Sequence, residues 1–373
     1  MAINSKHSDL SEKEKYYLAS QWQLMWYKFR RHKLAIIGGS ILVALYLMAI
    51  FADFLSPYTP DQSFTKYPFH KPTPIHIFGP DGQLQRPFVY GTTSKRDVKT
   101  LELIHTVDPD VRYPIGFFVH AGSHKFLGLV ETDIHLFSVA EPGVIFLFGT
   151  DDIGRDIFTR NFYAARLSLS IGLVGVALSF LIGVTLGGIS GYYGGGVDTG
   201  IQRIIEFLIT IPTIPLWLAL SAAMPRDWSV VNIYFGIVVI LSLVGWGGLA
   251  RVVRGKILEL REQDYVLAAQ VAGMSDRAIL WTHLIPNFSS YLIVDITLAI
   301  PAVILAETAL SFLGLGLRSP AISWGVLLQK AQNIHSVAIY WWTIIPALFV
   351  VIAVLAFNFL GDGLRDAADP YKQ

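Results

Sequence analysis

Five ionisable side chains lie within or beside long apolar stretches of this chain, where a charge needs a reason to be present. Arg203 and Glu206 are three residues apart, so a helix would place them side by side, and Asp198 comes just before them. Asp295 and Glu307 have no neighbour of opposite charge in the sequence. Ionisable groups at membrane depth mark ion pairs, proton relays or gates.

The sequence favours structural roles for these five groups. Asp198, Arg203 and Glu206 are expected to form a charge cluster at the inner membrane boundary that holds helices together, with a part in gating as the alternative. Asp295 is expected to find a partner on another helix, and Glu307 is expected to contact water near the outer boundary. A proton relay is disfavoured because a relay needs a chain of such groups.

Other reactive chemistry finds little support in the sequence. The absence of cysteine excludes disulfides, thiolate metal sites and a cysteine nucleophile. No GxxxxGK[ST] phosphate loop occurs, so the chain has no recognisable means of binding ATP itself. His105, His120, His124 and His135 lie in one region, but the residues around them indicate strand and turn rather than a helix, and no metal site is predicted.

The composition indicates that these residues are positioned by membrane-spanning helices. Of the 373 residues 53% are hydrophobic and only 15% are charged, and the mean hydropathy is +0.49. Soluble domains carry about 25% charged residues. Each of six apolar runs is close to the ~20 residues that a helix needs to cross a bilayer. They cover residues 34–51, 167–188, 201–222, 230–250, 288–310 and 340–360.

Basic residues beside the short loops predict the orientation. Lys28, Arg30, Arg31 and Lys33 precede the first run, and Arg251, Arg254, Lys256 and Arg261 follow the fourth. Both positions are therefore expected in the cytoplasm. With six spans, both termini are cytoplasmic as well.

Residues 1–33 are expected to form a cytoplasmic segment with an amphipathic helix. Ser11 and Glu14 form a capping box, and Leu18, Trp22, Met25 and Phe29 then recur at helical spacing. Such a helix could lie in the inner membrane interface, or it could pack on the surface of the protein itself.

Residues 52–147 are expected to form an external insert. Its first part is rich in proline, and short apolar runs follow at 86–90, 113–119, 126–130 and 144–148. A turn is predicted at 121–123, around Gly122. The pattern indicates a small subdomain with β structure on the outer face, which either touches a partner or caps the path. The remaining residues, 148–373, would hold the other five spans and a cytoplasmic loop at 251–287.

Residues 265–287, within that loop, are polar and favour helix. Ala268, Ala269 and Ala272 make the first stretch slim, so that another surface could approach it closely. Gly273 permits a turn with positive φ. Ser275 is a plausible N-cap for a second helix over 276–283, and Pro286 is expected to end it. The pattern indicates a short helix parallel to the membrane that docks on a soluble partner.

Gly183, Gly187 and Gly191 recur at a spacing of four in the second apolar run. On a helix they form one smooth stripe, which favours close packing of another helix over a ligand site. The glycine-rich stretch 187–196 lacks the Lys-Ser/Thr ending of a phosphate loop.

Residues 265–287 resemble the cytoplasmic EAA loop of ABC importer permeases. The core of that loop is Glu-Ala-Ala, three residues, a glycine, and later a hydrophobic residue followed by proline. This chain has Leu267-Ala268-Ala269, then Gly273, then Ile285-Pro286. Leu267 stands where the family has glutamate, so a salt bridge from that position is not expected.

Further stretches resemble the dipeptide and oligopeptide permeases of the C-subunit type. They are FGTDDIGRD at 148–156, RLSL at 166–169, GYYGG at 191–195 with Asp198, LAETALSFLGLG at 305–316, SWG at 323–325 and GDGLRDAADP at 361–370. Arg203, Glu206 and Pro212 belong to the same series. The resemblance covers the first span and nearly all of residues 147–373, and covers the insert poorly.

The resemblance implies an all-α polytopic membrane protein with the type I ABC importer permease fold, in a bacterial or archaeal inner or cell membrane. It implies a second permease subunit, two ATPase subunits that carry ATP and Mg²⁺, and an external solute-binding protein. It gives no role to nucleic acid. The residues that would couple this chain to an ATPase are Ala268, Ala269, Gly273, Met274, Ser275, Ile279, His283 and Pro286.

The resemblance implies transport of peptides by alternating access, with oligosaccharides, opine-like compounds and nickel complexes as other substrates of related permeases. No substrate-contacting residue can be named from the sequence. A channel or secondary transporter would need more charged or hydroxyl-rich helix interiors and no docking helix. An intramembrane enzyme would need a nucleophile paired with a base, and no such pair is recognisable.

Overall fold

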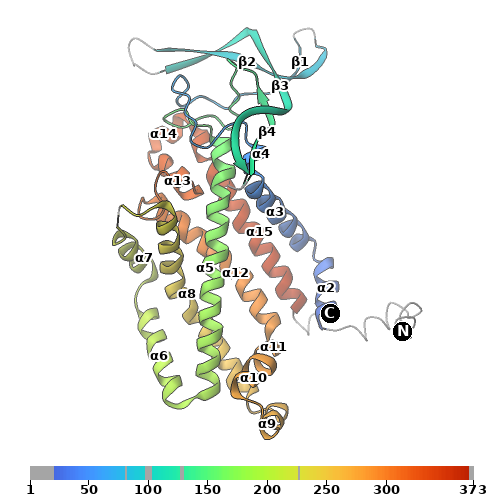
Figure 1. Cartoon of the computed structure of the whole chain (residues 1–373), viewed down its shortest axis with the longest axis vertical. Coiled ribbons are helices and arrows are strands. Elements are labelled where there is room, and N and C mark those ends of the chain that lie inside the picture. The colour runs from blue at the N-terminus through green and yellow to red at the C-terminus, as the bar shows by residue number, and fades with distance from the viewer. Residues whose placement is uncertain (1–20, 80–81, 97–102, 127–129, 226, 369–373) are drawn as a thin grey trace, which may run out of the picture.

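The computed structural model describes residues 21–79, 82–96, 103–126, 130–225 and 227–368, and its architecture is a helical bundle with a small sheet at one end (Figure 1). The helices are α2 (Gln21–Arg31), α3 (Lys33–Ile50), α4 (Ala52–Leu55), α5 (Ile157–Tyr193), α6 (Gly195–Thr210), α7 (Thr213–Ala222), α8 (Val230–Leu260), α9 (Asp264–Val271), α10 (Asp276–Ala278), α11 (Ile285–Asn287), α12 (Ser289–Phe312), α13 (Trp324–Leu328), α14 (Ile334–Ile339) and α15 (Ile345–Ala368). A π-helical stretch, Ile279–Leu284, joins α10 to α11, and 3₁₀ turns cover Gln329–Gln332 and Trp341–Ile344.

In the described part of the chain, five helical segments are long and apolar enough to cross a membrane: α3, α5, α8, α12, and α15 with the 3₁₀ turn before it. Several extend beyond the predicted apolar runs. At 1.5 Å per residue, the 31 residues of α8 span about 46 Å, more than the ~30 Å of hydrocarbon. The helix is therefore longer than the hydrocarbon layer is thick, and Arg251, Arg254 and Lys256 lie towards its C-terminal end.

The predicted third span is not one straight helix. Residues 201–222 fall in α6 and α7, which are bent by 85° at a short break, and together they could form a sixth span or a re-entrant loop. Pro212 explains the break, because proline lacks an N–H and forces the preceding residue out of helical geometry. Ile211 accordingly has extended backbone angles, with φ −80° and ψ 126°.

The glycine stripe of α5 is a helix-packing surface, as the sequence predicts. A Cβ atom would lie 3.0 Å from the carbonyl oxygen of Trp246 at Gly183, and 2.8 Å from that of Arg254 at Gly191. At Gly187 it would overlap a backbone oxygen of α8. The two backbones therefore come closer than any side chain would permit. This contact fixes α8 along α5, which runs the length of the bundle (Figure 1).

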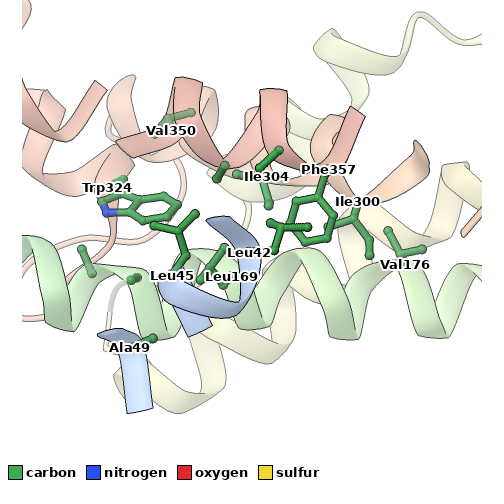
Figure 2. Close-up of a cluster of buried hydrophobic side chains, with 14 of the residues drawn as sticks. Leu42, Leu45, Ala49, Leu169, Val176, Ile300, Ile304, Trp324, Val350 and Phe357 are labelled. Carbon is green, nitrogen blue, oxygen red and sulfur yellow. The ribbon is translucent and has the colours of Figure 1, made fainter. Parts of the chain in front are cut away.

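The largest apolar core joins α3, α5, α12, α13 and α15. Figure 2 shows Leu42 of α3, Leu169 of α5, Ile304 of α12 and Phe357 of α15 meeting in this cluster, with Trp324 of α13 at one end. Lipid tails are as apolar as these side chains, so the cluster is stabilised by dispersion contacts in a close-packed interior rather than by removal from water.

The insert contains a four-stranded antiparallel sheet in the order β1-β2-β3-β4, which lies at the opposite end of the molecule from α9 (Figure 1). The strands are β1 (His76–Phe78), β2 (Leu84–Arg96), β3 (Leu103–Phe126) and β4 (Val130–Val139). The expectation of β structure is confirmed. The turn predicted at 121–123 is wrong, because β3 runs through these residues and only shifts register against β4 between His120 and His124. Residues 144–148 form no strand.

Part of the amphipathic N-terminal segment is described. Ser11, Glu14 and Leu18 lie outside the described residues, but residues 21–31 form α2, which packs against α15. Met25 is buried, with its Sδ 3.3 Å from Ser290 Oγ at the start of α12. Trp26 and Tyr27 are exposed. One side of α2 thus rests on the protein itself, and its other side is an apolar aromatic surface.

Candidate functional site

The polar segment that follows α8 folds as the sequence predicts in its first half. α9 ends at Val271, and Gly273 has a φ of +79°, which is the left-handed region that favours glycine. Ser275 then caps the next helix, and its side chain accepts a hydrogen bond from the N–H of Ala278. The helix continues past the predicted end. Pro286 lies within α11, and α12 begins at Ser289.

One side of this segment is anchored by buried apolar side chains. Val266, Ile279 and Leu284 are fully buried against Val253 and Ile257 of α8. Met274 packs at the edge of this cluster.

Ala269 also belongs to the anchoring cluster and is only 8% exposed. Ala269, which was expected from the sequence to face a partner together with Ala268, thus points into the core of this chain. The two alanines are adjacent on a 3.6-residue helix, about 100° apart, and Ala268 alone is exposed.

The opposite side of α9 is apolar and exposed. Val271 is 91% exposed and Leu267 is 47% exposed, and Ala268 and Ala272 are exposed on the same side. Among the other predicted coupling residues, Gly273, Ser275 and Pro286 are exposed and His283 is half-buried. A short helix that buries Val266 and Ala269 while leaving Leu267 and Val271 exposed presents an apolar surface for contact.

A groove of about 520 Å³ lies beside this surface and is lined by Tyr192, Arg261, Glu262, Leu267, Gln270 and Asp276. Its walls are tied together by hydrogen bonds. Arg261 Nη1 donates to the carbonyl oxygens of Gly191 at 3.1 Å and Tyr192 at 3.3 Å, at the C-terminal end of α5. Tyr192 Oη donates to Asp276 Oδ1 at 2.9 Å. The end of α5 is thereby fastened to the segment after α9.

Asp198 and Arg254 join α6 to α8 just behind this groove. Arg254 Nε lies 2.5 Å from Asp198 Oδ1, and Arg254 Nη2 lies 2.6 Å from Oδ2. Ser190 Oγ donates to the same carboxylate at 2.5 Å. The sequence placed Asp198 in a structural cluster but did not identify Arg254, which is 56 residues away, as its partner.

Arg203 and Glu206 form the predicted neighbouring pair, with Nη1 to Oε2 at 2.7 Å. Their side chains are 77% and 48% exposed, so the pair lies on the surface of α6. The expectation that it holds helices of this chain together is wrong. An exposed pair of this kind contributes little to stability.

Glu307 is completely buried, which corrects the expectation that it contacts water. Its Oε1 accepts hydrogen bonds from Ser311 Oγ at 2.7 Å and Ser323 Oγ at 2.9 Å. Ser168 Oγ of α5 lies 3.5 Å from Oε2 and accepts from the N–H of Trp324. One carboxyl group thus links α5, α12 and α13.

Asp295, in the first half of α12, is half-buried. In the described part of the chain no ion pair or hydrogen bond to its side chain is found, so the predicted partner on another helix is not among those residues.

The comparisons with known proteins agree with this architecture. Residues 183–372 match the family model for the binding-protein-dependent transport system inner membrane component. Residues 20–72 match the N-terminal TM domain of oligopeptide transport permease C. The chain belongs to this permease family. Its members are membrane components of ABC transporters, in which separate ATPase subunits hydrolyse ATP.

Two curated relatives of the permease match nearly its whole length, and a third matches part of it. It is 32% identical to the oligopeptide transport system permease protein OppC of Bacillus subtilis over 352 residues, 94% of this chain and 90% of that protein. It is 32% identical to the dipeptide transport system permease protein DppC of Lactococcus lactis, over 99% and 96% of the two chains. It is 42% identical to DppC of Bacillus subtilis over 229 residues, 61% and 70% of the two chains.

A solved structure described as an inward-facing MetNI methionine ABC transporter aligns with 54% of this chain and 93% of that one. The TM-score is 0.43 and the sequence identity is 18%, a likeness too weak for a detailed comparison.

At the sheet end of the permease, Arg166 of α5 binds the end of α3. Its Nη2 lies 2.6 Å from Asp53 Oδ2, and its Nε donates to the carbonyl oxygen of Ala49 at 2.6 Å. Tyr163 Oη donates to Asp53 Oδ1 at 2.5 Å. Sequence reasoning assigned Arg166 no function, although the RLSL motif that contains it was one of the family signals.

The motif at 148–156 clamps the insert onto the bundle. Thr150 Oγ1 accepts a hydrogen bond from the N–H of His70 at 2.8 Å, and Trp342 Nε1 donates to Thr150 O at 3.0 Å. Asp151 holds Arg155 in an ion pair of 2.7 Å. Gly154, at φ +81°, lies against the backbone of Phe64, where a Cβ would not fit. The insert is therefore seated on α5 and on the segment before α15 by buried contacts.

Two ionisable groups in this clamp are strongly perturbed. Burial, together with the nearby His105, lowers the pKa of His70 to about 4. Burial also raises the pKa of Asp156 to about 7, although its Oδ2 accepts hydrogen bonds from the N–H and hydroxyl of Thr159. Both groups are expected to stabilise the folded clamp in their neutral forms.

Of the four histidines weighed as metal ligands, three have partners at one or both ring nitrogens. His105 lies 2.8 Å from both Ser94 Oγ and Pro68 O, and His135 contacts Ser56 O and Gly122 O. His120 pairs with Asp133 at 2.9 Å. In the described residues no group of three or more His, Asp or Glu side chains could hold a metal ion.

Proposed function

We propose that this permease carries short peptides, together with a second, related permease subunit, two ATPase subunits and an external solute-binding protein. The names of its relatives, dipeptide and oligopeptide permeases of similar length, support the substrate class. Oligosaccharides and other small solutes remain the alternative, because the binding protein does most of the selecting and is another chain.

The exposed apolar side of α9 supports a coupling role for residues 264–287. Its buried side is fixed to α8, so a force applied at Val271 or Leu267 is transmitted to a membrane-spanning helix rather than absorbed by a loop. ATP and Mg²⁺ would be bound by the ATPase subunits. Closure of the ATPases on ATP would then move α9 and α8, and the path would open alternately to the two sides of the membrane.

The orientation that fits this mechanism places both termini and α9 in the cytoplasm. The basic residues Lys28, Arg30 and Arg31 at the end of α2, and Arg251 and Arg254 on α8, support it. The sheet of the insert, which lies at the other end of the bundle, would then face the exterior (Figure 1).

Cysteine crosslinking tests the coupling assignment cleanly, because the native chain has no cysteine. In the assembled transporter, Val271→Cys is expected to crosslink to cysteines placed on the ATPase. The matched variant Ala269→Cys, two residues away but only 8% exposed, is expected to react poorly. Absence of crosslinks at Val271, Leu267 and Ala268 alike would contradict the assignment.

Uptake measurements test the substrate class separately. Cells that depend on this transporter are expected to accumulate labelled di- or tripeptides, and to lose that uptake when the chain is deleted. If deletion of the chain instead abolishes uptake of an oligosaccharide and leaves peptide uptake unchanged, the peptide assignment is refuted. That result would not affect the coupling role.

A further inference from the structure

An apolar groove of about 1,070 Å³ lies at the sheet end of the bundle, between the end of α3, strand β4 and the first turns of α5. Its volume is near the upper end of the ~300–1,000 Å³ that small-molecule sites occupy. Leu47 and Phe51 form one wall, Ile134 and Leu136 of β4 another, and Phe158 and Phe162 of α5 the floor. We propose that an acyl chain of a membrane lipid occupies this groove.

The chemistry of the lining favours an apolar ligand. Eleven of its twelve residues are apolar, and the exception, Thr132, has its hydroxyl oxygen engaged by the N–H of Ile134 at 3.3 Å. A groove without polar partners holds water poorly. Phe158 and Phe162, with ring centroids 4.4 Å apart, make the floor continuous.

The position of the groove places it at the membrane boundary. The 18 residues of α3 span about 27 Å, close to the thickness of the hydrocarbon layer, so the end of α3 at Ile50 lies near the boundary on the side of the sheet. Ala44 and Met48 line the groove below that level, and β4 lines it above (Figure 1). The groove thus leads from the acyl-chain region into the interface, whichever side of the membrane carries the sheet.

The exposed face of α3 is consistent with lipid. The closest helix contact of α3 is already made with α15: Ala35 is fully buried, and a Cβ at Gly38 would lie 2.6 Å from the carbonyl oxygen of Ala356. The face that remains carries the exposed small residues Ser40 and Ala44 beside bulky apolar side chains, with Val43 59% and Leu47 48% exposed. Bulky apolar side chains on a spanning helix are suited to lipid, and the groove is continuous with them at Leu47 and Phe51.

The inference gives β4 a function that the sequence did not suggest. Ile134 is 38% exposed on an edge strand, where an apolar side chain would invite aggregation in water. An acyl chain along the groove would cover Thr132, Ile134 and Leu136, which are on one face of the strand because side chains alternate. The insert would then be seated partly on lipid.

Fluorescence quenching tests the inference in the assembled transporter reconstituted into bilayers. An environment-sensitive probe on Leu136→Cys is compared with probes on Leu47→Cys, in the lipid-facing wall, and on Leu84→Cys, which is 75% exposed at the start of β2. Brominated acyl chains are expected to quench the Leu136 probe about as much as the Leu47 probe. Iodide in the water is expected to quench only the Leu84 probe.

Two outcomes would overturn the inference. Quenching of the Leu136 probe by iodide would mean that water fills the groove, and protection from both quenchers would mean that a protein partner covers it. Thr132→Cys gives a second reading from the same wall if Leu136→Cys fails to assemble. Orientation and coupling do not affect these readings, so failure here leaves the proposed function untouched.

Discussion

Arg254 donates two hydrogen bonds to Asp198, from Nε at 2.5 Å and from Nη2 at 2.6 Å, and so ties α6 to α8. The side chains are only 32% and 17% exposed. A planar guanidinium that meets a carboxylate at two points is geometrically specific, and lysine cannot reproduce it. This pair, rather than Arg203 with Glu206, is therefore the structural charge pair near the predicted inner boundary.

Removal of this pair is expected to destabilise the transporter. Arg254→Ala leaves the Asp198 carboxylate with Ser190 as its remaining partner, and the loss of charged hydrogen bonds costs about 1.5–3 kcal/mol each. A lower melting temperature of the purified complex and reduced uptake are expected. The matched control is Arg203→Ala, on the exposed surface of α6, which is expected to change the melting temperature much less. Equal effects of the two variants would contradict the assignment.

The transporter is expected to tolerate Glu307→Gln but not Glu307→Ala. Glutamine keeps the carbonyl oxygen that accepts from Ser311 and Ser323. Alanine leaves these buried hydroxyl groups without an acceptor and opens a cavity. Each unsatisfied hydroxyl group destabilises the fold by about 1–3 kcal/mol. The yield of assembled complex measures the difference. Asp295→Ala, at a half-buried position, serves as the control, and a Glu307→Ala variant that assembles normally would refute the linking role.

Gly273→Val is expected to abolish most uptake while the protein remains in the membrane. Open space surrounds Gly273, so the penalty is purely conformational: a β-branched residue at φ +79° costs on the order of 1–3 kcal/mol. The turn would relax and α9 would lose its orientation. Gly255→Ala is the control, since Gly255 lies in α8 with open space and an ordinary helical backbone. Normal uptake by Gly273→Val would count against the coupling role.

His70 is expected to make the clamp between insert and bundle sensitive to acid. Its pKa is about 4 in the folded protein and about 6.5 when unfolded, so the unfolded chain binds more protons between these values. The stability from the neutral ring is complete above about pH 6.5 and is lost as the pH falls towards 4, by about 3 kcal/mol. Melting temperatures of the complex between pH 4 and 7 measure this loss.

His70→Gln is expected to flatten that pH profile, whereas His76→Gln, at a half-buried position on β1, is expected to leave it unchanged. The contribution of His70 must be read from the difference between variants, because the titration of Asp156 changes the stability with pH in the opposite direction. Its raised pKa means that the folded state loses stability as the pH rises from about 4 to about 7. An unchanged slope in His70→Gln would show that the ring is not protonated on unfolding.

Local features of this chain were readable from the sequence because neighbouring residues decide them. The apolar runs predicted six spans, of which five are single helices in the described residues. The spacing of Gly183, Gly187 and Gly191 predicted a packing stripe, and Gly273 predicted a turn. Helical periodicity and the steric freedom of glycine act within a few residues, so no knowledge of the rest of the fold was needed.

Only the tertiary structure decided which partners the charged and polar groups meet. Asp53 and Arg166 are 113 residues apart, and no local pattern pairs them. Glu307 was expected to contact water because it lies near one end of an apolar run, whereas two of its serine partners come from α5 and from the segment before α13.

The sequence likewise did not show which residues of a short helix point into the core and which point outward. Ala268 and Ala269 are interchangeable in sequence, and only the packing of α9 against α8 turned one outward and the other into the core. A hydrogen bond or an apolar contact depends on distance in space, and the chain sets that distance only when the whole bundle has closed.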